Sequence, residues 1–69
     1  MKPEEIKEIR TTLRVTQEKF AALVGTTVTT INRWENGKAK PSRLYVRELK
    51  DLKKNYGSYL HRTKQSENT

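Results

Sequence analysis

The chain contains no cysteine and a single histidine, and these two absences remove several kinds of chemistry. Without cysteine there is no disulfide, no thiolate zinc site and no cysteine nucleophile. The histidine, His61, lies in a polar segment with no carboxylate cluster beside it, so neither a metal site nor a catalytic triad can be assembled around it. We therefore expect no enzymatic activity, no metal and no cofactor, and we expect His61 to be solvated.

Long apolar runs are also missing. No stretch approaches the roughly 20 residues that span a bilayer, and the residues from Met1 to Glu5 lack the apolar segment of a signal peptide. Hydrophobic residues make up only 32% of the 69, and none lies between His61 and Thr69. So short a chain has little room for a cleft that encloses a substrate. We expect one small cytoplasmic domain over residues 1–57, followed by a flexible polar tail over residues 58–69.

Positive charge is abundant and unevenly distributed. The formal net charge is +7, from 15 Lys and Arg against 8 Asp and Glu. Residues 1–37 carry 6 basic and 5 acidic side chains (+1), whereas residues 38–69 carry 9 and 3 (+6), so the excess lies in the second half. Charge of this kind favours an anionic partner, which can be a nucleic acid, an acidic protein or a lipid headgroup. The alternative is a solvated helix face with no partner.

The spacing of apolar residues predicts helices and no strands. Pro3 suits the first turn of a helix, where its missing N–H would have had no partner. Ile6, Ile9 and Leu13 then form one apolar stripe, which ends near Arg14. The first expected helix therefore begins near Pro3 and ends near Arg14.

Two short helices are expected next, joined by a tight turn. Thr16 is a suitable N-cap for a helix that begins at Gln17, and Gly25 ends this helix because glycine readily adopts a positive φ. Thr27 can cap a third helix over residues 28–35. This arrangement of two helices and a three-residue turn with glycine is a helix-turn-helix.

The fourth expected helix is the longest. It follows a loop that contains Pro41, and Ser42 is its expected cap. Its apolar positions are Tyr45, Leu49, Leu52 and Tyr56. Gly57 is expected to close it, and Tyr59 and Leu60 could add one further turn.

At residues 17–36 the order of residue types is restrictive, and the chain resembles the lambda repressor-like helix-turn-helix family, of the XRE and phage repressor/Cro type. The residues that carry the resemblance are Thr16, Gln17, Glu18, Ala21, Gly25, Thr26, Thr27, Ile31, Trp34, Glu35, Asn36, Gly37, Lys38, Lys40 and Pro41. The resemblance covers about residues 4–56. It implies an all-α bundle of four to five short helices whose third helix lies in the DNA major groove.

The resemblance also implies a function. A family member of this type is expected to be a sequence-specific transcriptional regulator, here a repressor, that binds double-stranded DNA as a homodimer on a pseudo-palindromic operator. It is expected to be bacterial or phage-encoded and associated with the nucleoid. The family's dimer contact comes from its last helix, which is reduced here to a turn around Tyr59 and Leu60 or is absent.

Two other functions remain open. One is an antitoxin or adaptor-type protein-interaction module, with a toxin or effector as its protein partner and with secondary DNA binding. The other is a basic amphipathic helix on a membrane, which needs an apolar face that is free in solution. Because Tyr45, Leu49 and Leu52 are expected in the core, no membrane partner is expected.

The outward face of the third helix supplies the expected base contacts. A helical wheel turns Ile31 and Trp34 inward. The residues that share the outward face are Val28, Thr29, Asn32 and Arg33. Arg33 can pair with O6 and N7 of guanine, Asn32 with adenine or a phosphate, and Val28 with the methyl group of thymine. For Val28 the alternative is a single exposed apolar side chain, which is common on protein surfaces.

The resemblance implies phosphate contacts around this helix. The residues concerned are Gln17, Thr27, Asn36, Lys38, Lys40 and Arg43. Gln17 would contact a phosphate or a base; Thr27, Asn36 and Lys38 would act through their backbone, and Lys40 and Arg43 through their side chains. Arg43 follows a cap and can lie beside exposed helix N–H groups, which form an anion site. The alternative is that Lys40 and Arg43 are only solvated.

An ion pair between Arg10 and Glu35 is also implied by the resemblance. It would join the first helix to the end of the third and support the recognition helix. Such a pair gives Glu35 a structural role, and we therefore expect no catalytic role for it.

Overall fold

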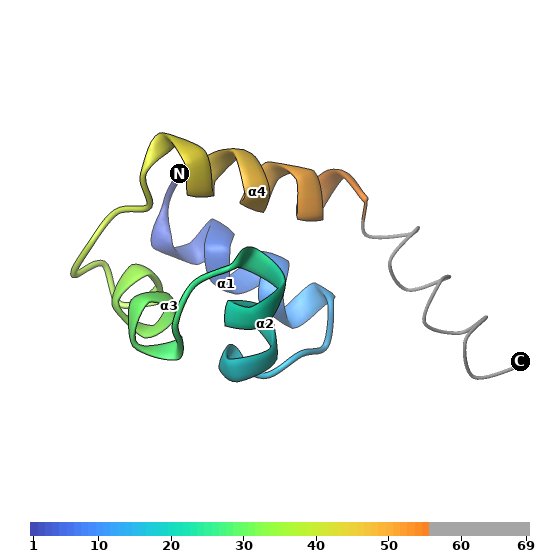
Figure 1. Cartoon of the computed structure of the whole chain (residues 1–69), viewed down its shortest axis with the longest axis horizontal. Coiled ribbons are helices and arrows are strands. Elements are labelled where there is room, and N and C mark those ends of the chain that lie inside the picture. Colours follow the sequence, from blue (N-terminus) through green and yellow to red (C-terminus); the bar gives the residue numbers. More distant parts are fainter. Residues whose placement is uncertain (56–69) are drawn as a thin grey trace, which may run out of the picture.

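The computed structural model describes residues 1–55, and within them the chain forms four α-helices and no strand (Figure 1). The helices are α1 (Pro3–Thr12), α2 (Gln17–Val24), α3 (Val28–Glu35) and α4 (Arg43–Lys54). The predicted all-α fold is confirmed. The predicted closing residue Gly57, the turn at Tyr59 and Leu60, the solvated His61 and the tail over residues 58–69 lie outside the described residues.

The first helix begins as predicted and ends earlier than predicted. Pro3 is its first residue, and the carboxylate of Glu5 accepts the backbone N–H of Lys2 at 3.0 Å. α1 ends at Thr12, whereas the apolar stripe predicted an end near Arg14. The reason is that Arg14 has a φ of 58°, in the left-handed region, where a helix cannot continue.

Threonine hydroxyls cap the two helices of the helix-turn-helix. The Oγ1 of Thr16 accepts the N–H of Lys19 at 3.1 Å, and the Oγ1 of Thr27 accepts the N–H of Thr30 at 3.2 Å. Both caps confirm the sequence predictions. Ser42 occupies the predicted N-cap position of α4, but its hydroxyl makes no capping hydrogen bond. The first turn of α4 therefore keeps N–H groups that no side-chain cap satisfies.

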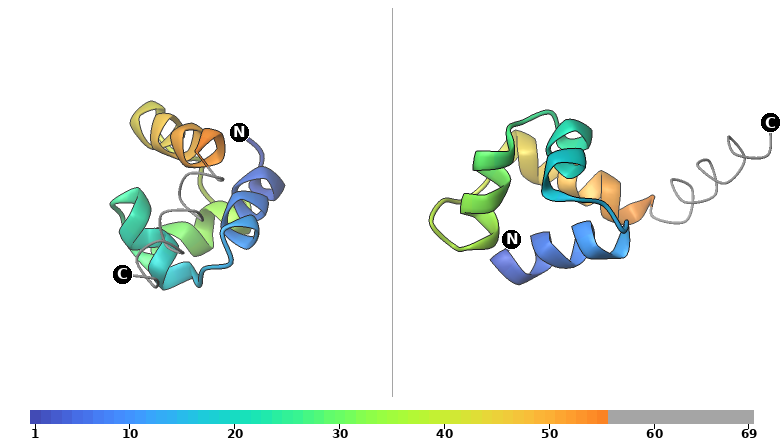
Figure 2. Two further views of the ribbon diagram at one scale, coloured as in Figure 1. Left: turned by 90° about the vertical axis from the view of Figure 1, so that its right-hand side faces the viewer. Right: turned by 90° about the horizontal axis from the view of Figure 1, so that it is seen from below.

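One core joins the four helices. Its buried residues are Ile6, Ile9, Leu13, Phe20, Ala21, Val24, Ile31, Trp34 and Leu49. Tyr45 and Leu52 of α4 are half-buried and pack against this core. The rings of Trp34 and Tyr45 lie 5.2 Å apart between centroids, at an angle of 57°. Figure 2 shows the four helices around one common centre. Tyr56, the last predicted apolar position, lies outside the described residues.

The arrangement of the helices places α3 at one end of the bundle. α3 packs against α2 and α1, and α4 packs against α1 and α2. Figure 1 and the right panel of Figure 2 both show α3 and the 36–42 loop at the end opposite the last turn of α4. One face of α3 is therefore held by the core while the other is accessible.

Candidate nucleic-acid interface

The turn between α2 and α3 fixes the position of α3. Gly25 has a φ of +89°, and the N–H groups of Gly25 and Thr26 both donate to the carbonyl oxygen of Ala21, at 2.8 and 2.9 Å. This is the glycine-dependent helix end that the sequence predicts. Ala21 itself is only 4% exposed, in the helix that packs most extensively on α3. A small side chain there lets the two helices approach each other.

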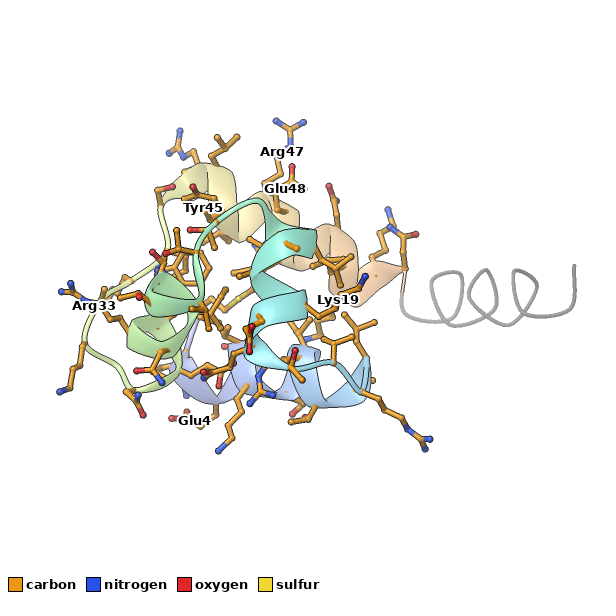
Figure 3. All side chains as sticks on the ribbon, turned by 60° about the horizontal axis from the view of Figure 1, so that its bottom comes forward. Glu4, Lys19, Arg33, Tyr45, Arg47 and Glu48 are labelled. Atoms are coloured by element: carbon orange, nitrogen blue, oxygen red, sulfur yellow. The ribbon has the colours of Figure 1, made fainter. Side chains whose placement is uncertain are left out.

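The accessible face of α3 carries the four residues predicted to contact bases. Ile31 and Trp34 are buried beneath the helix. The exposed residues are Val28, Thr29, Asn32 and Arg33. Val28 is 40% exposed, and Arg33 projects away from the bundle (Figure 3). Thr30 is half-buried, and Thr27 is exposed.

Asn32 is held by a hydrogen bond that the sequence analysis did not anticipate. The side-chain amide of Asn36 donates from Nδ2 to the Oδ1 of Asn32 at 3.1 Å, and both residues are exposed. Residues four apart are neighbours on a helix surface, so the spacing of the two asparagines is the signal that could have indicated this contact.

Backbone hydrogen bonds close the C-terminal end of α3. Gly37 has a φ of +72°, and the N–H groups of Gly37 and Lys38 donate to carbonyl oxygens in the last turns of α3, at 3.2 and 2.9 Å. The N–H of Asn36 donates to the carbonyl oxygen of Asn32 at 3.1 Å. This Schellman closure corrects one expectation, because the backbone N–H groups of Asn36 and Lys38 already have partners. A phosphate contact by either residue would have to use its side chain.

An ion-pair network joins α3 to the two preceding helices. The Nε and Nη2 of Arg10 donate to the two carboxylate oxygens of Glu35, at 2.7 and 3.1 Å. The side chains of Arg10 and Glu35 are 17% and 5% exposed. Arg10 also donates from Nη1 to the carbonyl oxygen of Val15 at 3.2 Å. The hydrogen bond to Glu35 raises the pKa of the Arg10 guanidinium, which burial alone would lower.

Gln17 takes part in the same network. Its Nε2 donates to the Oε1 of Glu35 at 3.2 Å, and the side chain is half-buried at the start of α2. Because this amide nitrogen has two hydrogens, one remains for a ligand. In the predicted contact with a phosphate or base, the side-chain amide of Gln17 would therefore bind Glu35 and the DNA at the same time.

The surroundings of α3 are positively charged. Over residues 1–55 the one ion pair is that of Arg10 with Glu35, and it neutralises the only carboxylate on α3. The basic residues from the start of α3 to the first residue of α4 are Arg33, Lys38, Lys40 and Arg43, all exposed. Arg43 is also the first residue of α4, next to the uncapped N–H groups of that helix. The end of the molecule that presents α3 is thus suited to an anionic ligand.

Other kinds of site find little support in the part of the chain that the structure describes. There, no three histidine, cysteine, aspartate or glutamate side chains are grouped to hold a metal ion. None of the helices formed by residues 1–55 has both the length and the apolar character to cross a membrane. Leu44 is 65% exposed at the start of α4, an apolar surface position that the sequence analysis did not single out.

A comparison with protein-family models matches residues 6–52 to a family described as helix-turn-helix. The matched range includes the turn at Gly25 and the whole of α3, and it covers more than half of the chain. Searches among curated proteins and among solved structures gave no match.

Proposed function

Because the chain belongs to the XRE/lambda repressor-like helix-turn-helix family of DNA-binding transcription regulators, which is not a family of enzymes, we propose that it is a sequence-specific transcriptional repressor. In this proposal α3 lies in the major groove, and a homodimer binds a pseudo-palindromic operator in bacterial or phage DNA. The two copies of α3 then lie roughly 34 Å apart on one side of the duplex.

The observation that carries the proposal is the exposed face of α3. Four residues of different chemistry project from a helix whose opposite face is buried in the core: Val28, Thr29, Asn32 and Arg33. Arg33 supplies two N–H donors in the geometry of O6 and N7 of guanine. Val28 exposes an apolar surface that a thymine methyl group can cover, and Thr29 offers a methyl group and a hydroxyl.

The phosphate contacts proposed here surround this face. Lys38 and Lys40 lie on the loop after α3, and Arg43 begins α4 beside uncapped N–H groups. Such N–H groups and cationic side chains bind phosphate oxygens without reading sequence. The exposed Thr27 at the start of α3 and the remaining hydrogen of Gln17 would contact the backbone on the other side of the helix.

In this proposal α3 enters the groove without repulsion from its own carboxylate. Glu35 is the acidic residue of α3, and two hydrogen bonds from Arg10 neutralise it at the core side of the helix. The face directed to DNA then carries Arg33 as its only charge. In this proposal the basic loop and α4 supply most of the attraction to phosphate, while a nearly neutral helix supplies the sequence preference.

Selection of binding sites from random duplexes tests the proposal. The full chain is used at two salt concentrations, and we expect a recovered sequence with two inverted half-sites about one helical turn apart. Affinity should fall as salt rises, because bound Lys and Arg release counterions from DNA. Equal affinity for selected and random duplexes at physiological salt would exclude a sequence-specific regulator. Recovery of a single half-site would instead exclude the dimer while leaving sequence-specific binding in place.

A further inference from the structure

Val28 is an apolar side chain on the face of α3 that is proposed to enter the groove. Within residues 1–55 two large hydrophobic side chains are exposed, Val28 at 40% and Leu44 at 65%, and of these Val28 alone belongs to α3. Its isopropyl group contains neither a hydrogen-bond donor nor an acceptor. It can therefore contact an apolar group of a base, and in the major groove that group is the methyl on C5 of thymine.

The polar side chains near Val28 on this face do not require one kind of partner on the base. Thr29 is the next residue, and its hydroxyl can donate or accept a hydrogen bond. Asn32 lies one turn further along the helix, and its amide has donors on Nδ2 and an acceptor in Oδ1. Oδ1 accepts from Asn36 at 3.1 Å and keeps a second lone pair. Both Thr29 and Asn32 can thus bind either a donor or an acceptor on the base.

Arg33 is the residue of this face whose side chain offers donors alone. It lies five residues after Val28, which corresponds to about 7.5 Å along the helix axis, whereas adjacent bases of one strand are about 3.4 Å apart. Figure 3 shows its side chain projecting away from the bundle. With α3 along the groove, the base pair beside Val28 and the base pair beside Arg33 are therefore different pairs.

Thymine and cytosine differ in two ways in the major groove. Thymine presents the acceptor O4 and the methyl group on C5, whereas cytosine presents the donor N4–H and no methyl group. Methylation of cytosine at C5 places the same methyl group at the same position beside that donor. The contact of Val28 depends on the methyl group, and neither Thr29 nor Asn32 excludes the donor.

We propose that Val28 reads the C5 methyl group itself, in thymine or in 5-methylcytosine, so that methylation of cytosine at this position increases the affinity of the protein for DNA. This inference rests on the proposed function, and it adds C5-methylated DNA to the ligands of the exposed face of α3. One methyl group buried against Val28 corresponds to an increase in affinity of about fourfold.

The first measurement identifies the methyl group that Val28 contacts. In one half-site of the selected duplex each thymine is replaced in turn by uracil, which lacks only the methyl group, and Kd is measured for wild type and for Val28→Ala. We expect one thymine whose replacement weakens binding of wild type about fourfold and binding of Val28→Ala less than about twofold. Alanine favours a helix more than valine does, so the variant should fold, and circular dichroism checks that it does.

The second measurement places the methyl group on a different base pair. The identified T·A pair is replaced by C·G, and the cytosine carries either hydrogen or a methyl group at C5. We expect wild type to bind the methylated duplex about fourfold more tightly than the unmethylated one, which is the ratio for thymine over uracil. Val28→Ala should bind both duplexes within about twofold. Leu44→Ala is the matched control, because it removes the other exposed apolar side chain and should keep both wild-type ratios.

The outcomes separate this inference from the proposed function. The inference is overturned if no thymine methyl depends on Val28, if the methyl group raises affinity in only one of the two base pairs, or if its effect persists in Val28→Ala. Loss of both ratios in Leu44→Ala would overturn it too, since the effect would then not belong to the α3 face. Equal affinity of wild type for the selected and a shuffled duplex would instead overturn the proposed function.

Discussion

The guanidinium of Arg10 on α1 and the carboxylate of Glu35 at the end of α3 are joined by two hydrogen bonds, of 2.7 and 3.1 Å, across 25 positions of the sequence. Gln17 at the start of α2 donates to the same carboxylate. Three helices thus meet at one acidic side chain that is only 5% exposed. This contact, together with the apolar core, holds α3 against α1 and α2.

Removing the cation from this pair should destabilise the fold. Arg10→Met leaves the carboxylate of Glu35 buried without its partner, and we expect the free energy of unfolding to fall by about 3 kcal/mol. Urea unfolding followed by the fluorescence of Trp34 measures the loss. Lys7→Met is the control, because Lys7 is exposed on the same helix and its loss should change stability by about 0.5 kcal/mol or less. Equal effects of the two substitutions would contradict a structural role for the pair.

Adjacent alanines on α2 test the close approach of α2 and α3. Ala21 is buried and Ala22 is exposed. Ala21→Leu should force the helices apart and reduce the free energy of unfolding by about 1 to 3 kcal/mol. Ala22→Leu adds the same atoms on the solvent side and should change it by about 0.5 kcal/mol or less. Thermal or urea unfolding distinguishes the two, and a tolerated Ala21→Leu would show that the packing at this contact is loose.

Arg14 and Gly25 both have a positive φ, so substitutions at these two positions should change the stability of the fold in opposite directions. Arg14 has a φ of 58° without being glycine, so Arg14→Gly should relieve strain and stabilise the fold by up to about 1 kcal/mol. Gly25 has a φ of +89°, and a Cβ there would meet no atom within 4 Å. Gly25→Ala should therefore destabilise through the backbone alone, by about 1 to 2 kcal/mol. Changes of the same sign in both variants would argue against this account of the two helix ends.

The carboxylate of Glu5 should stabilise the fold at neutral pH and lose this effect at strongly acidic pH. The hydrogen bond from the backbone N–H of Lys2 is the main cause that lowers the pKa of this carboxyl, and the cationic charge of Lys53 adds to it. A group whose pKa is lower in the folded state stabilises the fold above its unfolded pKa, about 4.3 for glutamate, and loses that contribution as the pH falls through the folded value. Glu5→Gln should therefore be less stable than wild type at neutral pH and equal to it at strongly acidic pH. A difference that persists at acidic pH would contradict the prediction.

Arg33 and Lys40 should affect DNA binding in different ways. Arg33→Ala should cost about 1 to 3 kcal/mol on the selected duplex and relax the preference at one base pair. Lys40→Ala should weaken binding to all duplexes alike and reduce the slope of log affinity against log salt by about one. Arg47→Ala removes the same charge as Arg33→Ala from a side chain of α4 that projects in another direction (Figure 3). A change in base preference in Arg47→Ala, or none in Arg33→Ala, would oppose the assigned roles.

Much of the fold could be predicted from local chemistry. Thr16, Thr27 and Gly25 fix helix ends through hydrogen bonds and a backbone angle within a few residues of themselves, so the sequence is sufficient to place them. The end of α1 could not be predicted in this way, because Arg14 adopts a positive φ without being a glycine or an asparagine. Its conformation accompanies hydrogen bonds from the backbone N–H groups of Arg14 and Val15 to the carbonyl oxygens of Thr11 and Arg10, which close the end of α1.

The candidate site was predictable to a similar extent. The helical wheel identified the exposed residues of α3, since burial of Ile31 and Trp34 determines which face remains. What each side chain does on that face depends on its neighbours in space. The contact of Gln17 with Glu35 requires the packed helices, and the contact of Asn36 with Asn32 requires the closed C-terminus of α3. A helical wheel cannot show the first of these contacts, whereas the spacing of the two asparagines could have indicated the second.

The central claim is that the exposed face of α3 reads DNA sequence. It is tested most directly by the ratio of the Kd values of the full chain for its selected duplex and for a shuffled duplex of the same composition, at physiological salt. The account predicts a ratio of about 10³ or more in favour of the selected duplex. A ratio close to one would contradict it and would leave only attraction between a basic protein and phosphate.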